Sequence, residues 1–197
     1  ITSLNSNNFQ SVVSVHGQGG TGYNGLKKGT VPYSNGITQA NSVKSCSDSM
    51  SRTDKVVGVT VIHGEADAGA ASGVYKGYLV QWQNDYDTDV KAITGQTENI
   101  PMFTDQMGSF TALSRTTSNV PIDQLAAAEE NPGKIYLVGP KYFLTYSPDD
   151  GVHLTNTSYR WLGEYYGKVI KKVVVDGESW KPLSPKEIVR KGNIVYA

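Results

Sequence analysis

The chain has 197 residues, and its 18 Lys and Arg residues balance 18 Asp and Glu residues, so the formal net charge is zero. A protein that binds nucleic acid by neutralising phosphates carries a basic surplus, which is lacking here. No apolar run approaches the roughly 20 residues of a membrane span, and the single cysteine, Cys46, excludes an internal disulfide framework and a cysteine-rich zinc site. We therefore expect no nucleic-acid partner and no membrane partner, and the length predicts one domain.

The first half of the chain alternates between β-branched runs and helical patterns. Residues 9–16 (FQSVVSVH) predict a buried strand, which a glycine cluster at residues 17–22 closes. Apolar residues at near-helical spacing predict a helix over residues 34–52. Residues 55–62 (KVVGVTVI) are almost continuously apolar, which is typical of a strand covered on both faces.

The second half continues the alternation. An apolar stripe predicts a long amphipathic helix over residues 74–93, followed by a strand at residues 100–104. A proline in the first turn indicates a short helix at residues 121–130. Residues 134–138 predict a strand and residues 155–173 a further helix.

The pattern changes after the last predicted helix. Residues 174–180 predict short strands and turns, and residues 193–197 predict a strand that stops without a polar tail. The chain also begins at Ile1 without a basic or apolar leader. We therefore expect an incomplete domain at residues 1–173, a linker or the start of a β-rich module at residues 174–197, and a fragment of a longer polypeptide overall.

Strands that alternate with helices predict an α/β fold with an open, mainly parallel sheet. In such sheets, functional sites form at the carboxyl ends of the strands. This rule selects three loops, at residues 17–22, 63–67 and 147–153.

The third loop contains Asp150-Gly151-Val152-His153, immediately before a predicted helix. An Asp three residues before a His can accept a hydrogen bond from one imidazole nitrogen, which leaves the other nitrogen to act as a general base. The same spacing also fits a simpler interpretation, in which Asp150 lies at the positive end of a helix dipole and His153 is a solvated loop residue.

The second loop, His63-Gly64-Glu65-Ala66-Asp67, follows a predicted buried strand. Its polar groups need partners there. His63 could donate a hydrogen bond to an oxyanion while Glu65 and Asp67 fix the loop. The three side chains are also possible metal ligands, but their spacing matches no recognised zinc pattern, so we expect no metal. They could equally cap the turn and helix that follow.

The first loop, Gly17-Gln18-Gly19-Gly20-Thr21-Gly22, formally fits a dinucleotide-binding pattern. A poor helix start after Gly22 and the lack of an acidic residue at the end of a second strand argue against that use, so we expect no cofactor. A backbone N–H of Gly19 or Gly20 that donates to an oxyanion is the better interpretation.

Together these loops resemble the SGNH-hydrolase superfamily, in particular the sialate O-acetylesterase-like carbohydrate esterases. The segment His63–Ala68 is similar to the Q-G-E-S-D block of that branch, and Gly19-Gly20-Thr21 is similar to its G-G-T/S segment. Asp150-Gly151-Val152-His153 resembles its terminal D-x-x-H block. The resemblance implies a flavodoxin-like three-layer sandwich, with His153 as general base, Asp150 as its orienting partner, and Gly19, Gly20, His63 and Glu65 at the oxyanion and substrate side.

The sequence departs from that family in two places. His63 stands where the family commonly has Gln, and the block that carries the nucleophilic Ser after the first strand is missing. The family strand order, 2-1-3-4-5, would place the missing strand between residues 9–16 and 55–62. We therefore expect an upstream segment or a companion chain to supply both that strand and the Ser, unless the sheet closes in a different order.

The resemblance implies a carbohydrate O-acetylesterase with an acetylated carbohydrate as substrate. The alternative is a catalytically inactive, SGNH-like glycan-binding or structural module of a cell-surface or virion fibre protein, although Trp82 and Trp161 lie on helical faces that favour core positions. A dinucleotide-dependent enzyme ranks below both. The sequence does not give the compartment; these functions favour a secreted, cell-surface or virion-associated location.

Overall fold

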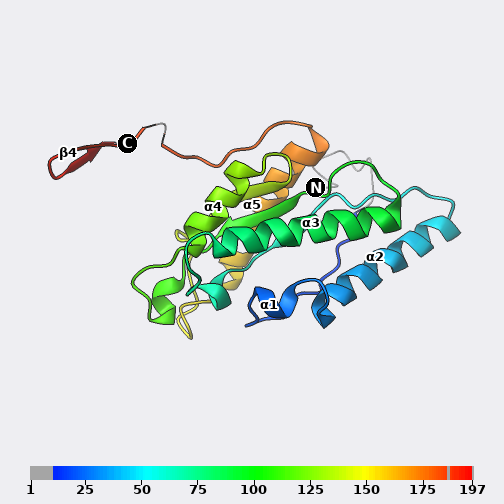
Figure 1. Cartoon of the computed structure of the whole chain (residues 1–197), viewed down its shortest axis with the longest axis horizontal. Coiled ribbons are helices and arrows are strands. Elements are labelled where there is room, and N and C mark those ends of the chain that lie inside the picture. The colour runs from blue at the N-terminus through cyan, green and yellow to red at the C-terminus, as the bar shows by residue number, and fades with distance from the viewer. Residues whose placement is uncertain (1–10, 186, 197) are drawn as a thin grey trace.

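The computed structural model describes residues 11–185 and 187–196. Its central sheet has the order β1-β2-β3, formed by β1 (Val59–Val61), β2 (Met102–Gln106) and β3 (Ile135–Pro140). Both pairings are parallel, with Thr60 opposite Phe103 and Phe103 opposite Tyr136. The predicted α/β class with a parallel sheet is therefore confirmed (Figure 1).

Helical segments connect and flank these strands. They are α1 (Tyr23–Leu26), α2 (Val31–Ser49), η2 (Glu65–Asp67), α3 (Val74–Thr94), η3 (Phe110–Leu113), α4 (Val120–Glu130), α5 (Asn156–Ile170) and η4 (Lys171–Val175). The four longer α-helices match the predicted helices within a few residues at each end, whereas α1 was not predicted. Within the described ranges, no helix is both long and apolar enough to span a membrane.

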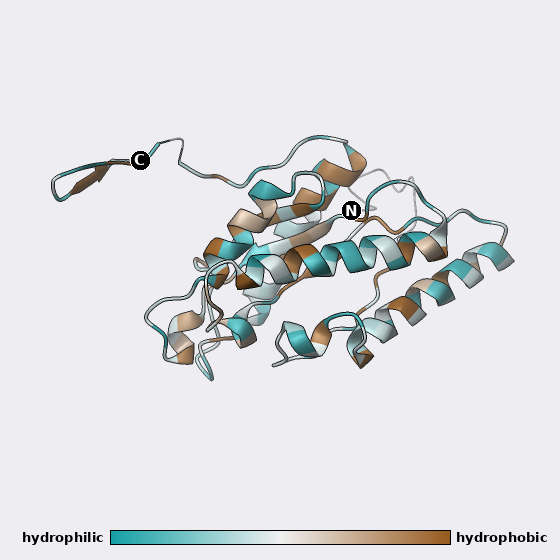
Figure 2. Cartoon of the chain, viewed as in Figure 1, coloured by the Kyte–Doolittle hydropathy of each residue, from teal (hydrophilic) through white to brown (hydrophobic). Residues whose placement is uncertain are grey.

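The sheet separates two apolar clusters. Successive residues of a strand point to opposite faces, and the neighbours Met102 and Phe103 belong to different clusters. Met102 packs with residues of α3 and α4, and Phe103 packs with residues of α5. Helices α3 and α4 therefore cover one face and α5 the other, and apolar and polar residues alternate along α3 as a surface helix requires (Figure 2).

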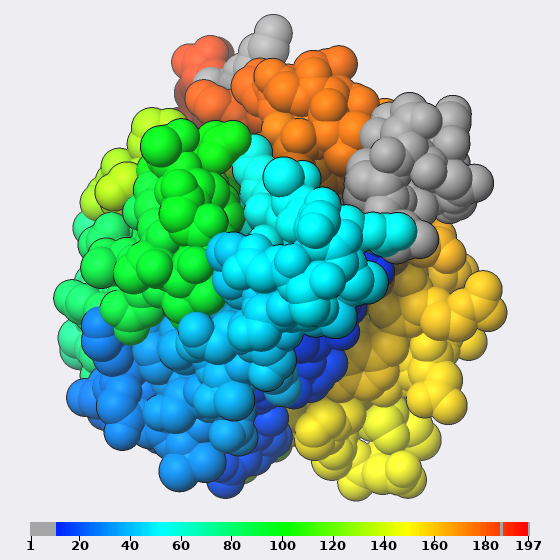
Figure 3. All heavy atoms as spheres, turned by 90° about the vertical axis from the view of Figure 1, so that its right-hand side faces the viewer, coloured from blue at the N-terminus to red at the C-terminus, as the bar shows by residue number. Residues whose placement is uncertain are grey.

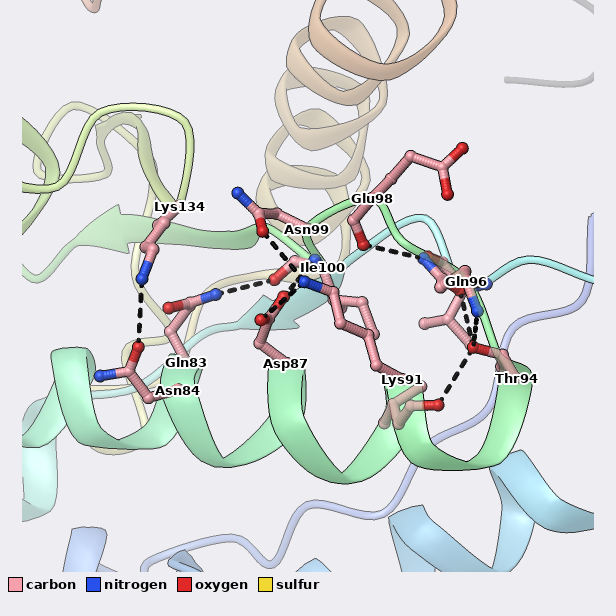
Figure 4. Close-up of polar contacts among 12 residues, drawn as sticks. Gln83, Asn84, Asp87, Lys91, Thr94, Gln96, Glu98, Asn99, Ile100 and Lys134 are labelled. Carbon is pink, nitrogen blue, oxygen red and sulfur yellow. Dashed lines mark hydrogen bonds and ion pairs between the residues drawn. The ribbon is translucent and has the colours of Figure 1, made fainter.

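Polar side chains fix the start and the middle of α3. The Asp123 carboxylate, on α4, accepts hydrogen bonds from the backbone N–H groups of Gly73 (2.9 Å) and Tyr75 (3.0 Å) at the first turn of α3. In the middle of α3, Gln83 donates to the Ile100 carbonyl (3.1 Å) and Asp87 accepts from the Ile100 N–H (2.8 Å) (Figure 4). These bonds fix the start of β2 against α3.

The predicted first strand is wrong where the structure describes it. Residues 11–16 form no strand, and the first two residues of the predicted run lie outside the described ranges. Val12, Val13 and Val15 are exposed, and the segment is held beside α2 by a hydrogen bond from the Gln39 amide to the Val15 carbonyl (3.2 Å). A strand needs a partner for its backbone, but this segment does not pair with the open edge of β1 and lies instead as a deep-blue strip beside α2 (Figure 3).

The C-terminal segment contains two parts. The π-helical η4 extends α5, and the Trp180 indole N–H donates to the Leu137 carbonyl (2.8 Å), so the chain still packs on β3 at this point. No strand forms over residues 174–180, contrary to the prediction. Beyond them, β4 (Val189–Lys191) and β5 (Ile194–Tyr196) pair as an antiparallel hairpin, which confirms the predicted terminal strand for the residues described (Figure 1).

The close packing at Gly64 gives a test of the fold. Gly64 has φ of +136°, and an added Cβ would lie 2.8 Å from Val120 Cγ1. We expect Gly64→Ala to lower the free energy of unfolding by about 1–3 kcal/mol, measured by urea denaturation. Gly77→Ala is the matched control, since Gly77 lies within α3 with open space around it; it should raise stability by about 0.5–1 kcal/mol. Equal effects of the two changes would contradict the packing described here.

Candidate functional site

The loops that follow the three parallel strands meet at one edge of the sheet. Gly108, after β2, packs so closely against the backbone of Tyr142, after β3, that an added Cβ would lie 2.9 Å from its Cα. Gly151 packs in the same way against Ala112 of η3. The structure therefore gathers the loops after β1, β2 and β3 at the carboxyl edge, where the sequence predicted a site.

An ion cluster at this edge joins all three strand ends. Lys141 Nζ lies 2.7 Å from Glu65 Oε1 and 2.7 Å from Asp105 Oδ2. The Lys141 side chain is 4% exposed and that of Asp105 is fully buried. The Tyr166 hydroxyl, on α5, lies 3.0 Å from Asp105 Oδ1. We call Glu65, Asp105 and Lys141 the buried clamp.

The charges of the buried clamp follow from its geometry. Burial alone lowers the pKa of Lys141, but the carboxylates of Asp105 and Glu65 outweigh it, so the pKa of Lys141 is raised and the ammonium keeps its charge. Burial raises the pKa of Asp105, and Lys141 opposes that rise. A buried ammonium between two carboxylates resists separation, because each partner would otherwise remain as an unpaired buried charge.

A second set of bonds joins the H-G-E-A-D segment to the glycine-rich loop. His63 Nε2 lies 2.9 Å from the Thr21 carbonyl oxygen, and Asp67 Oδ2 accepts from the Tyr23 N–H at 2.7 Å. Gly22 lies so close to Asp67 that an added Cβ would be 2.9 Å from its Oδ1. His63 and Asp67 therefore fix the end of the glycine-rich loop in place.

The partners of His63 define its tautomer. A carbonyl oxygen only accepts, so Nε2 carries the hydrogen toward Thr21, and Nδ1 accepts from the Tyr75 hydroxyl at 2.6 Å. Burial, followed by the nearby carboxylates, raises the pKa of Tyr75 well above its usual value, so this hydroxyl stays protonated. Both ring nitrogens are engaged within the protein. In this geometry His63 has no free N–H for the predicted direct contact with an oxyanion. It instead positions the glycine-rich loop through Thr21.

Gly19 and Gly20 form an exposed turn after the N-terminal segment. Gly20 has φ of +67°, and an added Cβ at either position would meet open space. Within the described residues, no hydrogen bond uses the N–H of Gly19 or Gly20. These donors are therefore available to a ligand.

Asp150 and His153 form the predicted pair. His153 Nδ1 lies 2.5 Å from Asp150 Oδ2, while Asp150 Oδ1 accepts from the backbone N–H groups of Val152 (2.8 Å) and His153 (2.9 Å). Gly151 turns the chain with φ of +66°, and the His153 carbonyl accepts from the Ser147 N–H (2.7 Å), which closes the loop. The backbone fixes the carboxylate, and the carboxylate orients the imidazole.

The electrostatics of this pair suit a general base. The hydrogen bond from the His153 side chain, followed by those from the backbone N–H groups of His153 and Val152, lowers the pKa of Asp150 to about 2. Asp150 therefore remains a carboxylate, and in the neutral form of the ring it holds the hydrogen on Nδ1. Nε2 is then the acceptor, and the His153 side chain is 68% exposed.

The predicted site residues fall into two groups. His63 is bonded to the glycine-rich loop at Thr21 and Glu65 to Lys141, whereas no hydrogen bond within the described ranges joins the Asp150–His153 pair to either of them directly. The connection passes through η3 and its preceding residue, because Ser109 Oγ lies 3.4 Å from Glu65 Oε1 and Ala112 contacts Gly151.

The structure adds site residues that the sequence did not indicate. Asp105 and Lys141 sit in strand-end segments that carried no motif, and only a three-dimensional arrangement shows that both face Glu65. In the part of the chain that the structure describes, no group of three His, Cys, Asp or Glu side chains could hold a metal ion. His63, Glu65 and Asp67 instead bind other protein groups.

Comparisons of the chain with models of protein families, with curated proteins and with solved structures found no match.

Removing the lysine of the buried clamp should destabilise the fold strongly. Lys141→Met leaves the carboxylates of Asp105 and Glu65 facing each other without a cation, which should lower the free energy of unfolding by about 3–5 kcal/mol. Lys76→Met is the control, because Lys76 forms a surface pair with Glu130 at 2.8 Å and should change stability by about 0–1 kcal/mol. Chemical denaturation measures both. A Lys141→Met protein as stable as the Lys76→Met protein would show that the clamp does not hold the edge together.

Proposed function

We propose that the chain is the base-carrying part of a carbohydrate O-acetylesterase of the SGNH type, whose nucleophilic Ser lies outside this chain. The single observation that carries the proposal is the Asp150–His153 pair, since the carboxylate fixes the ring and leaves Nε2 as an exposed proton acceptor. Exposed backbone donors at Gly19 and Gly20, in a loop held in place by His63, supply a second part of such a site.

The proposed reaction is acyl transfer in two halves. The Ser hydroxyl attacks the acetyl carbonyl while His153 Nε2 takes its proton, and an N–H of Gly19 or Gly20 donates to the oxyanion. As the intermediate collapses, the C–O bond to the sugar breaks, and His153 gives its proton to the departing sugar oxygen. Water then attacks the acetyl-serine with His153 again as base, which releases acetate and restores the Ser hydroxyl.

The open side of the sheet supports a nucleophile from elsewhere. Strand β1 lies at the edge of the described sheet, and Ile62 just beyond it is about half exposed. An unpaired parallel edge with exposed apolar residues favours a further strand. A parallel strand from an upstream segment or companion chain beside β1 would take the place of the family's first strand and would end at the same edge as His153.

A second candidate function is a catalytically inactive, SGNH-like glycan-binding or structural module. The observation that favours it is that no hydroxyl within the described ranges is hydrogen-bonded to His153. The two functions differ in one structural feature of the assembled molecule, namely a Ser hydroxyl within hydrogen-bond distance of His153 Nε2.

The matched pair Asp150→Asn and Asp149→Asn tests the proposed function. In the complete polypeptide or complex that contains this chain, Asp150→Asn should lower kcat for p-nitrophenyl acetate by about 10²–10⁴-fold, because Asn no longer holds the hydrogen on Nδ1. Asp149 is an exposed neighbour whose carboxylate lies 3.2 Å from Ser147 Oγ, and Asp149→Asn should leave kcat within twofold of the starting value, roughly the scatter of such assays.

His153→Ala should lower hydrolysis at least as much as Asp150→Asn. Hydrolysis that survives His153→Ala at its original rate would contradict the role of the pair. Absence of hydrolysis in the unmodified assembly would favour the binding module instead.

A further inference from the structure

Four large aromatic side chains lie on the surface beside the candidate site. They are Tyr142 (70% exposed), Phe143 (50%), Trp161 (54%) and Tyr165 (42%), and we call them the aromatic platform. Trp161 was expected in the core, but the core face of α5 is formed by Leu162, Tyr166 and Val169. Exposed aromatic residues gathered in one place indicate a binding surface.

The platform is ordered by contacts between its rings. Tyr142 and Phe143 pack edge to face with ring centroids 6.0 Å apart, and Phe143 packs edge to face on Tyr165 at 5.8 Å. The backbone of Tyr142 is in turn fixed by its close packing against Gly108. Tyr142, Phe143 and Tyr165 therefore hold their positions before a ligand arrives, which lowers the entropic cost of binding.

A shallow hollow of about 320 Å³, largely open to solvent, lies along α5 beside two rings of the platform. It is lined by Trp161, Tyr165, Glu164 and Lys168. Within the described ranges, neither the Glu164 nor the Lys168 side chain takes part in a hydrogen bond or an ion pair, so a carboxylate and an ammonium stand beside two aromatic rings with their bonding capacity unused. The hollow thus combines flat apolar surface with available donors and acceptors.

The platform residues lie close in the chain to the candidate site. Tyr142 directly follows Lys141 of the buried clamp, and α5 begins three residues after His153. Trp161 lies in the second turn of α5, about 8 Å along the helix axis from its first residue. A molecule that extends over several times this distance of about 8 Å reaches both the hollow and His153.

We propose that the aromatic platform and its hollow bind a sugar residue of the glycan whose acetyl group reaches His153. A pyranose presents C–H groups that stack on aromatic rings, and hydroxyl groups that bond to Glu164 and Lys168 at its edge. A protein partner is disfavoured, since charged residues are depleted from the centres of protein interfaces, whereas two charged side chains line this hollow. The assignment of the sugar as substrate rests on the proposed function; the binding itself does not.

The first test measures binding without catalysis. In affinity gel electrophoresis through partially O-acetylated xylan or submaxillary mucin, the His153→Ala protein should be retarded by at least one polysaccharide. Adding Trp161→Ala or Tyr165→Ala should weaken that binding by about tenfold, since each change removes a stacking ring. Tyr159→Ala is the matched control, because Tyr159 is a 40% exposed aromatic residue of the same helix outside the platform, and it should bind like its parent.

The second test separates sugar binding at the aromatic platform from the esterase activity. In the complete assembly, Trp161→Ala should raise KM for the retarding polysaccharide about tenfold and leave kcat/KM for p-nitrophenyl acetate unchanged, because that ester has no sugar to stack. Loss of esterase activity in every protein, with retardation intact, would refute the proposed function and keep the platform. Three results would overturn the platform proposal. The first two are equal retardation of the Trp161→Ala and Tyr159→Ala proteins, and no retardation in either gel. The third is a dimer that dissociates only on Trp161→Ala.

Discussion

A single buried ammonium holds the carboxyl edge of this sheet together. Lys141, from the segment after β3, lies between Asp105 of β2 and Glu65 from the loop after β1, and Tyr166 of α5 contacts the same Asp105. Three neighbouring parallel strands and the helix on one face thus meet through charges that cannot separate without leaving an unpaired ion. Every loop proposed to carry chemistry starts from one of these strand ends or is bonded to one.

The buried clamp positions loops on two sides of the sheet. On the β1 side, the segment that carries Glu65 also carries His63 and Asp67, which hold the glycine-rich loop at Thr21 and Tyr23. On the β3 side, the loop after Lys141 presents Tyr142 and Phe143 of the aromatic platform and then the Asp150–His153 pair. The buried clamp therefore holds together the sheet edge from which the glycine-rich loop, His153 and the aromatic platform are positioned. The Asp150–His153 pair itself is formed by local hydrogen bonds.

The sequence predicts those parts of the fold that depend on local patterns. The apolar stripes of α3 and α5 and the D-x-x-H spacing of Asp150 and His153 each depend on residues close in the chain, and the structure contains all three. The strand predicted at residues 9–16 is absent over the described residues 11–16, because a strand requires a backbone partner whatever its β-branched content. The role of Lys141 was missed because it depends on tertiary contacts with Asp105 and Glu65. The surface position of Trp161 was missed because it depends on which face α5 turns toward the sheet.

The proposed esterase depends on an activated Ser that lies outside these 197 residues. The complete assembly, taken from its natural source, would be treated with a fluorophosphonate, which forms a covalent adduct with an activated Ser, and the adduct would be mapped by mass spectrometry of the peptides. We expect one adduct, on a Ser outside these 197 residues, and no adduct in the His153→Ala assembly. An adduct on a Ser of this chain, or none in the unmodified assembly, would contradict the claim.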